Sequence, residues 1–468
     1  MSEILLKYAN NRQKYIRIWQ SLLKSPTRIV ILGFAFFIIS GAILLMLPMA
    51  STGNPLGFID ALFTSTSAVC VTGLTVVDTG KAFSGFGQLI ILILIQAGGL
   101  GIMTVSTLFL MLTGRRPSLT GQMIVQDTYT HSGKQNPISI LKDIVLFTFA
   151  IEGAGIILLF FYFFTQNDWQ KSLFLAVFHS ISAFCNAGFS LFSDSFVAYR
   201  ESWMLNLVIC FLIVSGGLGF LVLSELKQKI LLKRRTWLRL SLHSKIVLST
   251  TAIMIFSGTV LVMIMEWNNT LAHLSVQNRI IAAFFQSVTA RTAGFNTLPI
   301  GQMANVTLFL LIVLMFIGAS PGSCGGGIKT TSLATIVALG TSRFQGWSRP
   351  QLFRRTISEK SIRKAIRVVM LSTFVVCIGI ILLQTTELGG VSHLESRGMF
   401  LELLFEVISA FGTVGLSTGT TAGLSTLGKL VITGMMFVGR LGPLAVGTAV
   451  SRRLPARYYY AEETIMIG

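Results

Sequence analysis

The chain has 468 residues, of which 52% are hydrophobic and only 12% are charged, with a formal net charge of +19. Soluble globular domains carry roughly 25% charged residues. Together with a mean hydropathy of +0.73, this argues against a soluble protein and for a chain whose solvent is largely lipid. The five cysteines are scattered and form no CxxC pair, so they signal neither a disulfide framework nor a zinc site.

Eight apolar stretches follow one another along the chain. A helix needs about 20 apolar residues to cross a hydrocarbon core of about 30 Å. The stretches cover residues 29–47, 89–112, 144–164, 204–223, 246–265, 306–339 with an interruption, 368–383 and 430–450. The first has no cleavage site followed by a soluble domain, so we interpret it as a retained helix. Eight spans place both termini on one side.

The charged residues separate by loop. Most of the 37 Lys and Arg residues lie before the first span, in every second loop and after the last span, which predicts that these segments are cytoplasmic. The other loops hold few basic residues, Arg279 and Arg291 among them, and a small excess of acids, which favours cations at the outer mouth. We interpret the basic balance as orienting the chain and contacting anionic lipids, not as binding nucleic acid.

A fourfold internal repeat organises the sequence. Four segments align without gaps on one glycine, at residues 67–74 (SAVCVTGL), 182–189 (SAFCNAGF), 288–295 (VTARTAGF) and 409–416 (SAFGTVGL). Each follows a helix-like run too short to span and lies between two spans. The repeated unit is therefore span, re-entrant pore helix, glycine loop and span. Because every unit starts and ends on the same side, we expect four parallel, pseudo-symmetric units around a central pore.

These patterns predict an all-α integral membrane protein with defined segments. The expected order is a basic cytoplasmic N-terminus at 1–28, repeat 1 at 29–112, repeat 2 at 142–226, repeat 3 at 245–340, repeat 4 at 367–450 and a cytoplasmic tail at 451–468.

The glycine loops suit the binding of a dehydrated cation. Backbone carbonyls replace hydration water only where the chain leaves regular helix while shielded from lipid, and glycine adopts a positive φ without steric cost. No charged side chain is common to the four loops, so we expect main-chain oxygens to select K⁺. The predicted filter comprises Val71, Thr72, Gly73, Leu74, Asn186, Ala187, Gly188, Phe189, Thr292, Ala293, Gly294, Phe295, Thr413, Val414, Gly415 and Leu416.

A second glycine cluster recurs in the second span of each unit. It occupies residues 98–101, 216–219, 318–321 and 439–442. Close helix packing through small residues and a bend beneath the pore are both open interpretations. In the third unit, proline and glycine must break the helix, and unwound backbone at this depth is expected to face the ion path.

Arg440 places a cation inside an apolar span. This is costly unless the side chain faces water, a carbonyl or an acidic partner; a helix-end arginine that reaches the inner surface is the alternative. We predict a gate formed by Gly318, Pro321, Gly322, Gly325, Gly326, Gly327, Lys329 and Arg440. A phosphate-binding loop from Gly322 to Thr330 is disfavoured, because Ile328 breaks the motif and no strand precedes it.

The glycine loops, residues 318–331 (GASPGSCGGGIKTT) and residues 439–443 (GRLGP) resemble the Trk/Ktr/HKT superfamily of potassium and sodium transporters, most closely the membrane subunits of Ktr systems. The resemblance covers essentially the whole chain. It implies K⁺ selectivity, because glycine in all four loops goes with K⁺ and serine in the first loop with Na⁺. It also implies an intramembrane gate loop at 318–331 acting with a pore arginine.

The same resemblance implies partners. These are a second copy in a homodimer and a cytosolic ring of KtrA-like nucleotide-binding regulatory subunits, docked on the basic inner loops. It implies no cofactor in this chain: K⁺ is the transported ion, and a Na⁺ dependence is left open. The predicted function is potassium uptake across the cytoplasmic membrane.

Two other functions compete with this prediction. A K⁺ symporter coupled to H⁺ or Na⁺ would use Glu152, which otherwise pairs with a serine or arginine of a neighbouring helix. An intramembrane enzyme is disfavoured, because no His, Asp or Cys set lies in register. We expect His179 to be a packing residue, and Cys70 and Cys185 to be small buried residues beside the filter.

Overall fold

The computed structural model of the chain describes residues 26–101, 137–230, 236–443 and 446. Most of the predicted N-terminus at 1–28, the end of the span at 89–112 and the tail at 451–468 therefore lie outside the described residues. The described elements are helices apart from one hairpin, in which β1 (Gln351–Leu352) pairs antiparallel with β2 (Arg355–Thr356). The predicted helical class is confirmed.

Each of the four predicted units begins with a long apolar helix. These are α2 (Pro26–Leu45), α8 (Pro137–Phe164), α13 (Leu242–Glu266) and α17 (Glu359–Leu388). All four are long and apolar enough to cross a membrane. Their large side chains include highly exposed ones, with 67% of Phe36, 73% of Phe256 and 62% of Phe374 accessible. In a lipid solvent these surfaces are buried, so their exposure is consistent with a chain that lies in a bilayer.

A shorter helix follows each long one. These are α3 (Phe58–Val69), α9 (Trp169–Phe184), α14 (Val276–Thr289) and α18 (Met399–Gly412). Their 12 to 16 residues are too few to cross a bilayer at 1.5 Å per residue. All four end at a glycine loop. We call these four the loop helices.

Another helix follows each glycine loop. Because it corresponds to the second predicted span of its unit, we call it the second helix. These helices are α5 (Gly85–Leu100), α10 (Trp203–Leu218), α15 (Asn305–Ile317) and α19 (Thr426–Leu441). Each is followed by a glycine of positive φ, at positions 101, 219, 318 and 442. The chain bends by 96° between α10 and α11 (Phe220–Ile230), and residues 318–329 separate α15 from α16 (Thr330–Phe344).

The prediction of eight spans is therefore only partly matched. By length and composition, four of the described helices could cross a membrane alone, or five when α10 and α11 count as one bent span. In the second unit the bend lies at the left-handed Gly219, a conformation that a helix does not accommodate in its interior. There the second glycine cluster produces a bend, one of the two interpretations left open, whereas most of the residues beyond α5 and α19 lie outside the described part of the chain.

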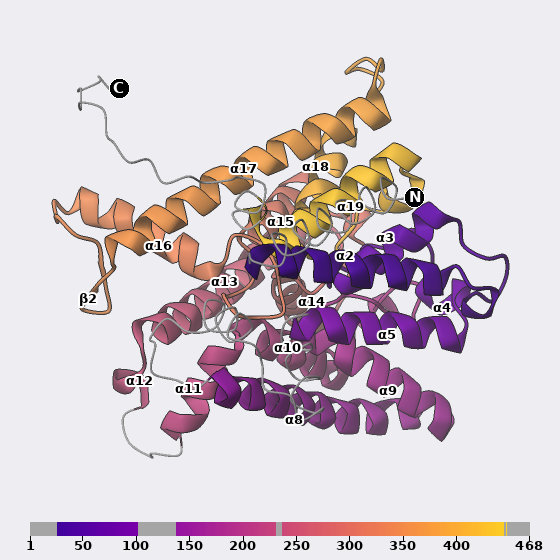
Figure 1. Cartoon of the computed structure of the whole chain (residues 1–468), viewed down its shortest axis with the longest axis horizontal. Helices are drawn as coiled ribbons and strands as arrows, with labels where there is room; N and C mark the ends of the chain where they lie inside the picture. The colour runs from indigo at the N-terminus through magenta and orange to yellow at the C-terminus, as the bar shows by residue number, and fades with distance from the viewer. Residues whose placement is uncertain (1–25, 102–136, 231–235, 444–445, 447–468) are drawn as a thin grey trace, which may run out of the picture.

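Contacts between the units run around a ring. Each second helix packs on the loop helix of the next unit: α5 on α9, α10 on α14, α15 on α18, and α19 back on α3. Figure 1 shows the outcome, with the yellow α19 lying beside the indigo and violet helices of the first unit. Short elements complete the chain, namely η1 (Pro48–Ala50), α4 (Thr79–Ala82), η2 (Val197–Tyr199), α12 (Thr236–Arg239), η3 (Ile300–Gln302) and η4 (Thr421–Gly423).

Aromatic side chains pack in the core that carries the glycine loops. The loop helices and the residues after their loops supply most of the fully buried phenylalanines, including Phe63, Phe178, Phe189, Phe295 and Phe405. Each buries a large apolar area and stiffens its surroundings. The glycine loops are therefore held in a rigid frame.

Candidate functional site

The four loop glycines are all left-handed. Their φ angles are 90° at Gly73, 71° at Gly188, 82° at Gly294 and 91° at Gly415. Only glycine adopts such angles at no steric cost. The sequence-based interpretation of these positions as backbone pivots therefore matches the observed conformation.

Sequence reasoning missed a second left-handed residue in every loop. The residue two positions before each glycine has φ of 56° at Val71, 58° at Asn186, 76° at Thr292 and 49° at Thr413. Of these four residues, only Asn186 is of a type that is enriched at positive φ. The other three are β-branched, and for β-branched residues a positive φ is a genuine outlier. Strain of this kind persists only where the surroundings impose it, and it concentrates at functional sites. Positive φ at every second position also departs from both helix and strand, so it turns main-chain carbonyls out of regular pairing.

The loops meet in a closed ring. A Cβ built on Gly73 would lie 3.0 Å from the Cα of Gly188, and one built on Gly188 would lie 3.0 Å from the Cα of Gly294. One built on Gly294 would lie 3.2 Å from the Cα of Gly415, and one built on Gly415 would lie 3.0 Å from the Cα of Gly73. In each case the nearest atom is a main-chain carbonyl oxygen of the adjacent loop. The four loops, distant in sequence, thus share one axis.

A cavity of about 200 Å³ opens on one side of this ring. All four loop glycines line it, together with hydroxyl, amide and carboxylate groups that include Ser190, Asp194, Asn296 and Ser417. The cavity is a polar vestibule with negative charge, which attracts cations.

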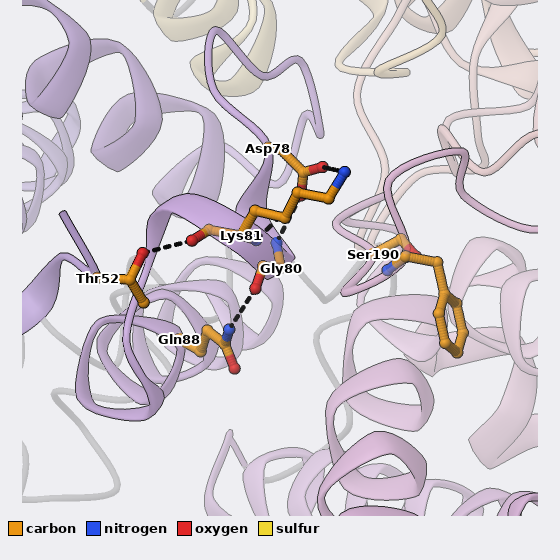
Figure 2. Close-up of polar contacts among 7 residues, drawn as sticks. Thr52, Asp78, Gly80, Lys81, Gln88 and Ser190 are labelled. Carbon is orange, nitrogen blue, oxygen red and sulfur yellow. Dashed lines mark hydrogen bonds and ion pairs between the residues drawn. The ribbon is translucent and has the colours of Figure 1, made fainter.

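Asp78 stands at the wall of this vestibule. Its carboxylate accepts hydrogen bonds from the backbone N–H groups of Gly80 (2.9 Å) and Lys81 (3.2 Å), which caps α4. Lys81 is also its ion-pair partner, at 3.8 Å. Gln88 and Thr52 bond the carbonyls of the same turn, and Figure 2 shows Ser190 across from this group. Asp78 therefore has a structural partner set, whereas Asp194 lines the cavity from the second loop.

Hydroxyls of the loop helices fix the loops. Ser67 and Ser409 accept hydrogen bonds from the backbone N–H groups of their loop glycines, at 3.0 and 3.1 Å. In the other two units, Ser182 donates to the carbonyl of the residue after the glycine at 2.8 Å, and Thr289 does the same at 2.6 Å. The serine that recurs in three of the four aligned segments, and Thr289 in the third unit, therefore hold the loops in place, a role that sequence reasoning did not assign.

The loop helices also shape the electrostatics. Each ends within a few residues of its loop glycine, so its C-terminus is directed at the ring. A helix C-terminus carries about half a negative charge. Four such ends contribute a negative electrostatic potential at the ring without any carboxylate.

The second glycine cluster packs against these helix ends. A Cβ on Gly98, Gly216 or Gly439 would collide with a carbonyl oxygen of the loop helix of the same unit, namely that of Val69, Phe184 or Phe411. Close packing is therefore realised together with the bend, so the two interpretations are compatible.

In the third unit, the segment 318–329 lies directly against the ring. The N–H of Gly326 donates to the hydroxyl of Thr413 at 3.0 Å, and a Cβ on Gly325 would collide with the hydroxyl of Thr292. On the other side, the N–H of Cys324 donates to the carbonyl of Gly216 at 3.2 Å. The segment therefore bridges the two glycine clusters, on the side of the ring away from the vestibule.

Two cations hold this segment by its carbonyls. Arg440 donates to the carbonyl oxygens of Cys324 and Gly98. Lys329 donates to the carbonyls of Gly325 at 2.6 Å and Gly326 at 3.1 Å. Arg440 thus has the carbonyl partners that one prediction required. The other predicted gate residues, Gly318, Pro321, Gly322 and Gly327, lie in the same segment.

Glu152 is buried, with 2% of its surface exposed. Gln96 donates to its carboxylate at 3.3 Å, and the thiol of Cys185 lies 3.9 Å away. The hydroxyl of Ser180 bonds its backbone carbonyl instead of its side chain. The predicted pairing with a serine or arginine side chain is therefore wrong, because a glutamine from the preceding unit supplies the donor.

The other residues singled out in the sequence are buried in the packed interior. His179 is fully buried, and so are Cys70 and Cys185 beside their loops. Arg291, which we assigned to an outer segment, is instead buried just after α14, where it donates to Thr251 at 3.3 Å. Counting the charges of each loop does not reveal that such an arginine is buried beside the end of a helix.

Comparison with known proteins agrees with this arrangement. Residues 6–460 match the family model TrkH, described as a cation transport protein. The chain is 40% identical to the Ktr system potassium uptake protein B of Bacillus subtilis over 446 residues, which cover 95% of this chain and 97% of that protein. It is 37% identical to the potassium/sodium uptake protein NtpJ of Enterococcus hirae, with the same coverage.

A solved structure shares the fold. The potassium transporter TrkH of Vibrio parahaemolyticus superimposes with a TM-score of 0.73 at 18% identity, over 92% of this chain and 86% of that one. The family match spans nearly the whole chain and the relatives exceed one third identity. With its long apolar helices, this chain is a membrane protein and belongs to the TrkH family of cation transport proteins.

Proposed function

We propose that this chain is the ion-conducting subunit of a Ktr-type potassium uptake system. The observation that carries the proposal is the closed ring of four left-handed glycines. A cation at this ring meets main-chain oxygens from four loops and the C-termini of four helices. The relatives named above for potassium uptake support K⁺ as the ion, and one of them is named for sodium as well.

The filter is assigned to the two left-handed positions of each loop and their neighbours, residues 71–74, 186–189, 292–295 and 413–416. K⁺ enters from the polar vestibule, where Asp194 and the hydroxyls raise the local cation concentration. Because no carboxylate is common to the loops, discrimination rests on carbonyl positions. Glycine at the first loop, Gly73, favours K⁺ over Na⁺.

The gate is assigned to residues 318–331 with Arg440. This segment lies against Thr292 and Thr413 on the inner side of the ring, and its carbonyls are held by Lys329 and Arg440. An intact segment obstructs the path, and release of the Arg440 contacts lets it withdraw. The positive charge of Arg440 adds an electrostatic barrier to cations.

The architecture that fits this function is four pseudo-symmetric units, each made of a span, a pore helix and a span. The ring of contacts from α5 to α9 and finally from α19 to α3 supports the arrangement. We assign eight spans, with the short or bent second helices counted as crossing, the segment boundaries given above, the cytoplasmic membrane as location and both termini in the cytoplasm. The basic loops, which include the exposed residues around β1 and β2, then face the cytoplasm.

The partners follow from the family. We propose a homodimer that binds a cytosolic ring of KtrA-like nucleotide-binding subunits through these basic loops, with anionic lipid headgroups at the same surface. The chain uses no cofactor of its own and binds no nucleic acid; K⁺ is its cargo, and Na⁺ is a regulator to be tested.

A coupled symporter is the second candidate. The observation that favours it is the buried carboxylate of Glu152, whose hydrogen-bond donor is the neutral amide of Gln96. A carboxylate inside a membrane protein without a cationic partner is costly and is commonly functional. Reversal potentials decide: a value set by the K⁺ gradient alone, at every external pH and Na⁺ concentration, removes the symporter. Glu152→Gln then keeps this K⁺ dependence.

The test of the main proposal is growth of cells that lack potassium uptake. Wild type restores growth at low K⁺, whereas Gly73→Ser lets Na⁺ compete. The physical reason is steric, because a side chain at φ of 90° is strained and its Cβ would meet the carbonyl of Ala187. The control is Gly53→Ser, since nothing lies within 4 Å of a Cβ there. Unchanged Na⁺ competition in Gly73→Ser would contradict the filter assignment.

A further inference from the structure

One helix position recurs behind the ring. The residues nine positions before the loop glycines are Thr64, His179, Phe285 and Glu406. Three of them, Thr64, His179 and Glu406, are polar and buried. The hydroxyl of Thr64 donates to the carbonyl of Asp60 in its own helix, whereas His179 and Glu406 bind residues beyond their helices. Each reaches past its loop to the segment that follows the glycine, which we call the exit segment.

Glu406 binds the exit segment of the fourth loop with both carboxylate oxygens. Oε1 accepts from the hydroxyl of Ser417 at 2.6 Å, the N–H of Thr418 at 3.1 Å and the hydroxyl of Thr420 at 3.1 Å. Oε2 accepts from the hydroxyl of Thr421 at 2.5 Å. All four partners donate, which matches a group that only accepts when ionised. Hydrogen bonds to a charged acceptor are the strong class.

His179 does the same for the second loop. Its Nε2 accepts from the N–H of Leu191 at 3.3 Å and lies 3.2 Å from the hydroxyl of Ser190. Because Nε2 accepts from an N–H, the proton is on Nδ1, which donates to the carbonyl of Leu175 at 2.8 Å. The ring also stacks on Phe192, with centroids 4.8 Å apart and planes 10° apart. Three consecutive residues of this exit segment thus contact one side chain.

The two tethered loops face each other across the axis. Gly188 and Gly415 each neighbour Gly73 and Gly294 around the ring, so they are opposite one another. The third exit segment is held differently, because the N–H of Asn296 donates to Ser195 of the second at 3.2 Å. For the first loop, no side-chain hydrogen bond holds residues 75–77 in the described part of the chain. Two opposing sides of the ring are therefore anchored by a buried side chain of their own loop helix.

We propose that Glu406 and His179 are positioning residues for cation selectivity, which they set by fixing the exit segments of two opposing loops. The proposal rests on the proposed function. Selectivity by carbonyl oxygens depends on where these oxygens lie, whether cavity size or ligand field is decisive. A free exit segment lets its loop relax and accept a smaller cation. Neither side chain touches the ion.

The test measures K⁺ and Na⁺ permeability from reversal potentials of the full chain in lipid bilayers. In Glu406→Gln the amide oxygen can replace Oε1, and the N–H₂ in the place of Oε2 has to donate to the hydroxyl of Thr421, so the contacts lose their charge and one of them reverses direction. We expect the K⁺/Na⁺ permeability ratio to fall about tenfold, the factor that corresponds to replacing a charge-assisted hydrogen bond by a neutral one. Ser417→Ala removes one hydrogen-bond partner of Glu406 and leaves the buried carboxylate unchanged. We expect the permeability ratio of this variant to fall less, by about threefold.

The role of His179 is tested by substituting both His179 and its partner Ser190. His179→Gln offers an amide oxygen as acceptor but no ring to stack, and His179→Ala offers neither. We expect the permeability ratio to fall more for alanine than for glutamine. Ser190→Ala, a small change in the exit segment, is the variant that still reports if both helix variants fail to fold.

The matched control is Glu266→Gln. Glu266 is equally buried and accepts from Asn269, Thr270, the N–H of Ala304 and Thr307, none of which lies in a glycine loop or exit segment. A purely structural role predicts the same outcome for Glu266→Gln and Glu406→Gln, namely less protein with unchanged selectivity. That result, or an unchanged ratio in Ser417→Ala and Ser190→Ala, overturns the proposal. If wild type itself shows no K⁺-selective flux, the proposed function has failed instead.

Discussion

The ring of glycine loops and the neighbouring segment 318–329 are both rich in glycine, but they are held in different ways. The ring is fixed by buried hydroxyls, a buried carboxylate and packed aromatic rings. The segment 318–329 is held mainly by backbone hydrogen bonds of 2.8 to 3.3 Å and by the tips of two long cations. Short, buried tethers resist displacement, whereas long side chains are easily redirected. The difference is consistent with the roles proposed above, a rigid filter (the rigid element) and a gate that is released from it (the releasable element).

The largest expected effect is on the rigid element. In Gly294→Ala, the added Cβ meets the carbonyl of Val414 and the Cα atoms of two loops, at a φ of 82°. We expect K⁺ uptake to be lost, by about 100-fold or more, because strain and clash act together. The measurement is K⁺ uptake into cells that lack other uptake systems. Gly434→Ala is the control, since a Cβ there has nothing within 4 Å. Wild-type uptake by Gly294→Ala would show that the ring is not rigid.

The next effect is on the releasable element. Arg440→Gln removes a charge and the two carbonyl contacts that join the segment to Gly98 and Cys324. We expect the K⁺ flux of protein reconstituted into vesicles to rise, by about tenfold, since hydrogen bonds from a charged group contribute roughly 1.5–3 kcal/mol. Arg363→Gln is the control, as its ion pair with Glu359 is exposed. A lower flux would mean that Arg440 supports the open path instead.

A smaller effect is expected where the two elements touch. Thr413→Val keeps the shape of the side chain but removes the acceptor for the N–H of Gly326. One neutral hydrogen bond contributes about 1 kcal/mol, so we expect the flux to rise about fivefold. In Thr433→Val the lost hydroxyl bonds only its own helix, and the flux stays the same. If Thr413→Val alters selectivity but not flux, the contact belongs to the rigid element.

The smallest effect concerns the closure of the ring between its last and first units. Lys429 pairs with Asp60 at 2.8 Å, and their side chains are 17% and 34% exposed. Asp60→Asn is expected to lower the free energy of unfolding by about 1 kcal/mol or less. Thermal unfolding in detergent measures it, with Glu359→Gln as the fully exposed comparison. A larger loss, with altered selectivity, would mean that the outer frame is less rigid than its packing suggests.

The repeat was the strongest signal in the sequence, because four glycines in one gap-free alignment define both the loops and their order. The helical class and the interruption at 318–329 also followed from composition and from proline and glycine. The left-handed Val71, Thr292 and Thr413 could not be predicted, since β-branched residues normally avoid this conformation. Tertiary packing imposes it, and packing is not visible in local sequence.

The same limit explains the other differences. An apolar run does not reveal where a glycine adopts a positive φ: the predicted span at 204–223 contains Gly219, at which the chain bends by 96°. Glu152 was expected to pair with a serine or arginine, but its partner Gln96 comes from another unit. Arg291 was assigned to an outer segment by counting charges per loop, but it is buried between α14 and the third loop glycine, where it donates to Thr251. In each case a contact between distant segments decided the outcome.

The packing of α19 on α3 also has a consequence for biogenesis. Lys429 and Asp60 are separated by 369 positions, and the carbonyl of Thr72 lies beside Gly415. The first and last loops can meet only after the last quarter of the chain has been translated, so the ring that we propose as the ion filter is completed by the last part of the protein to be made.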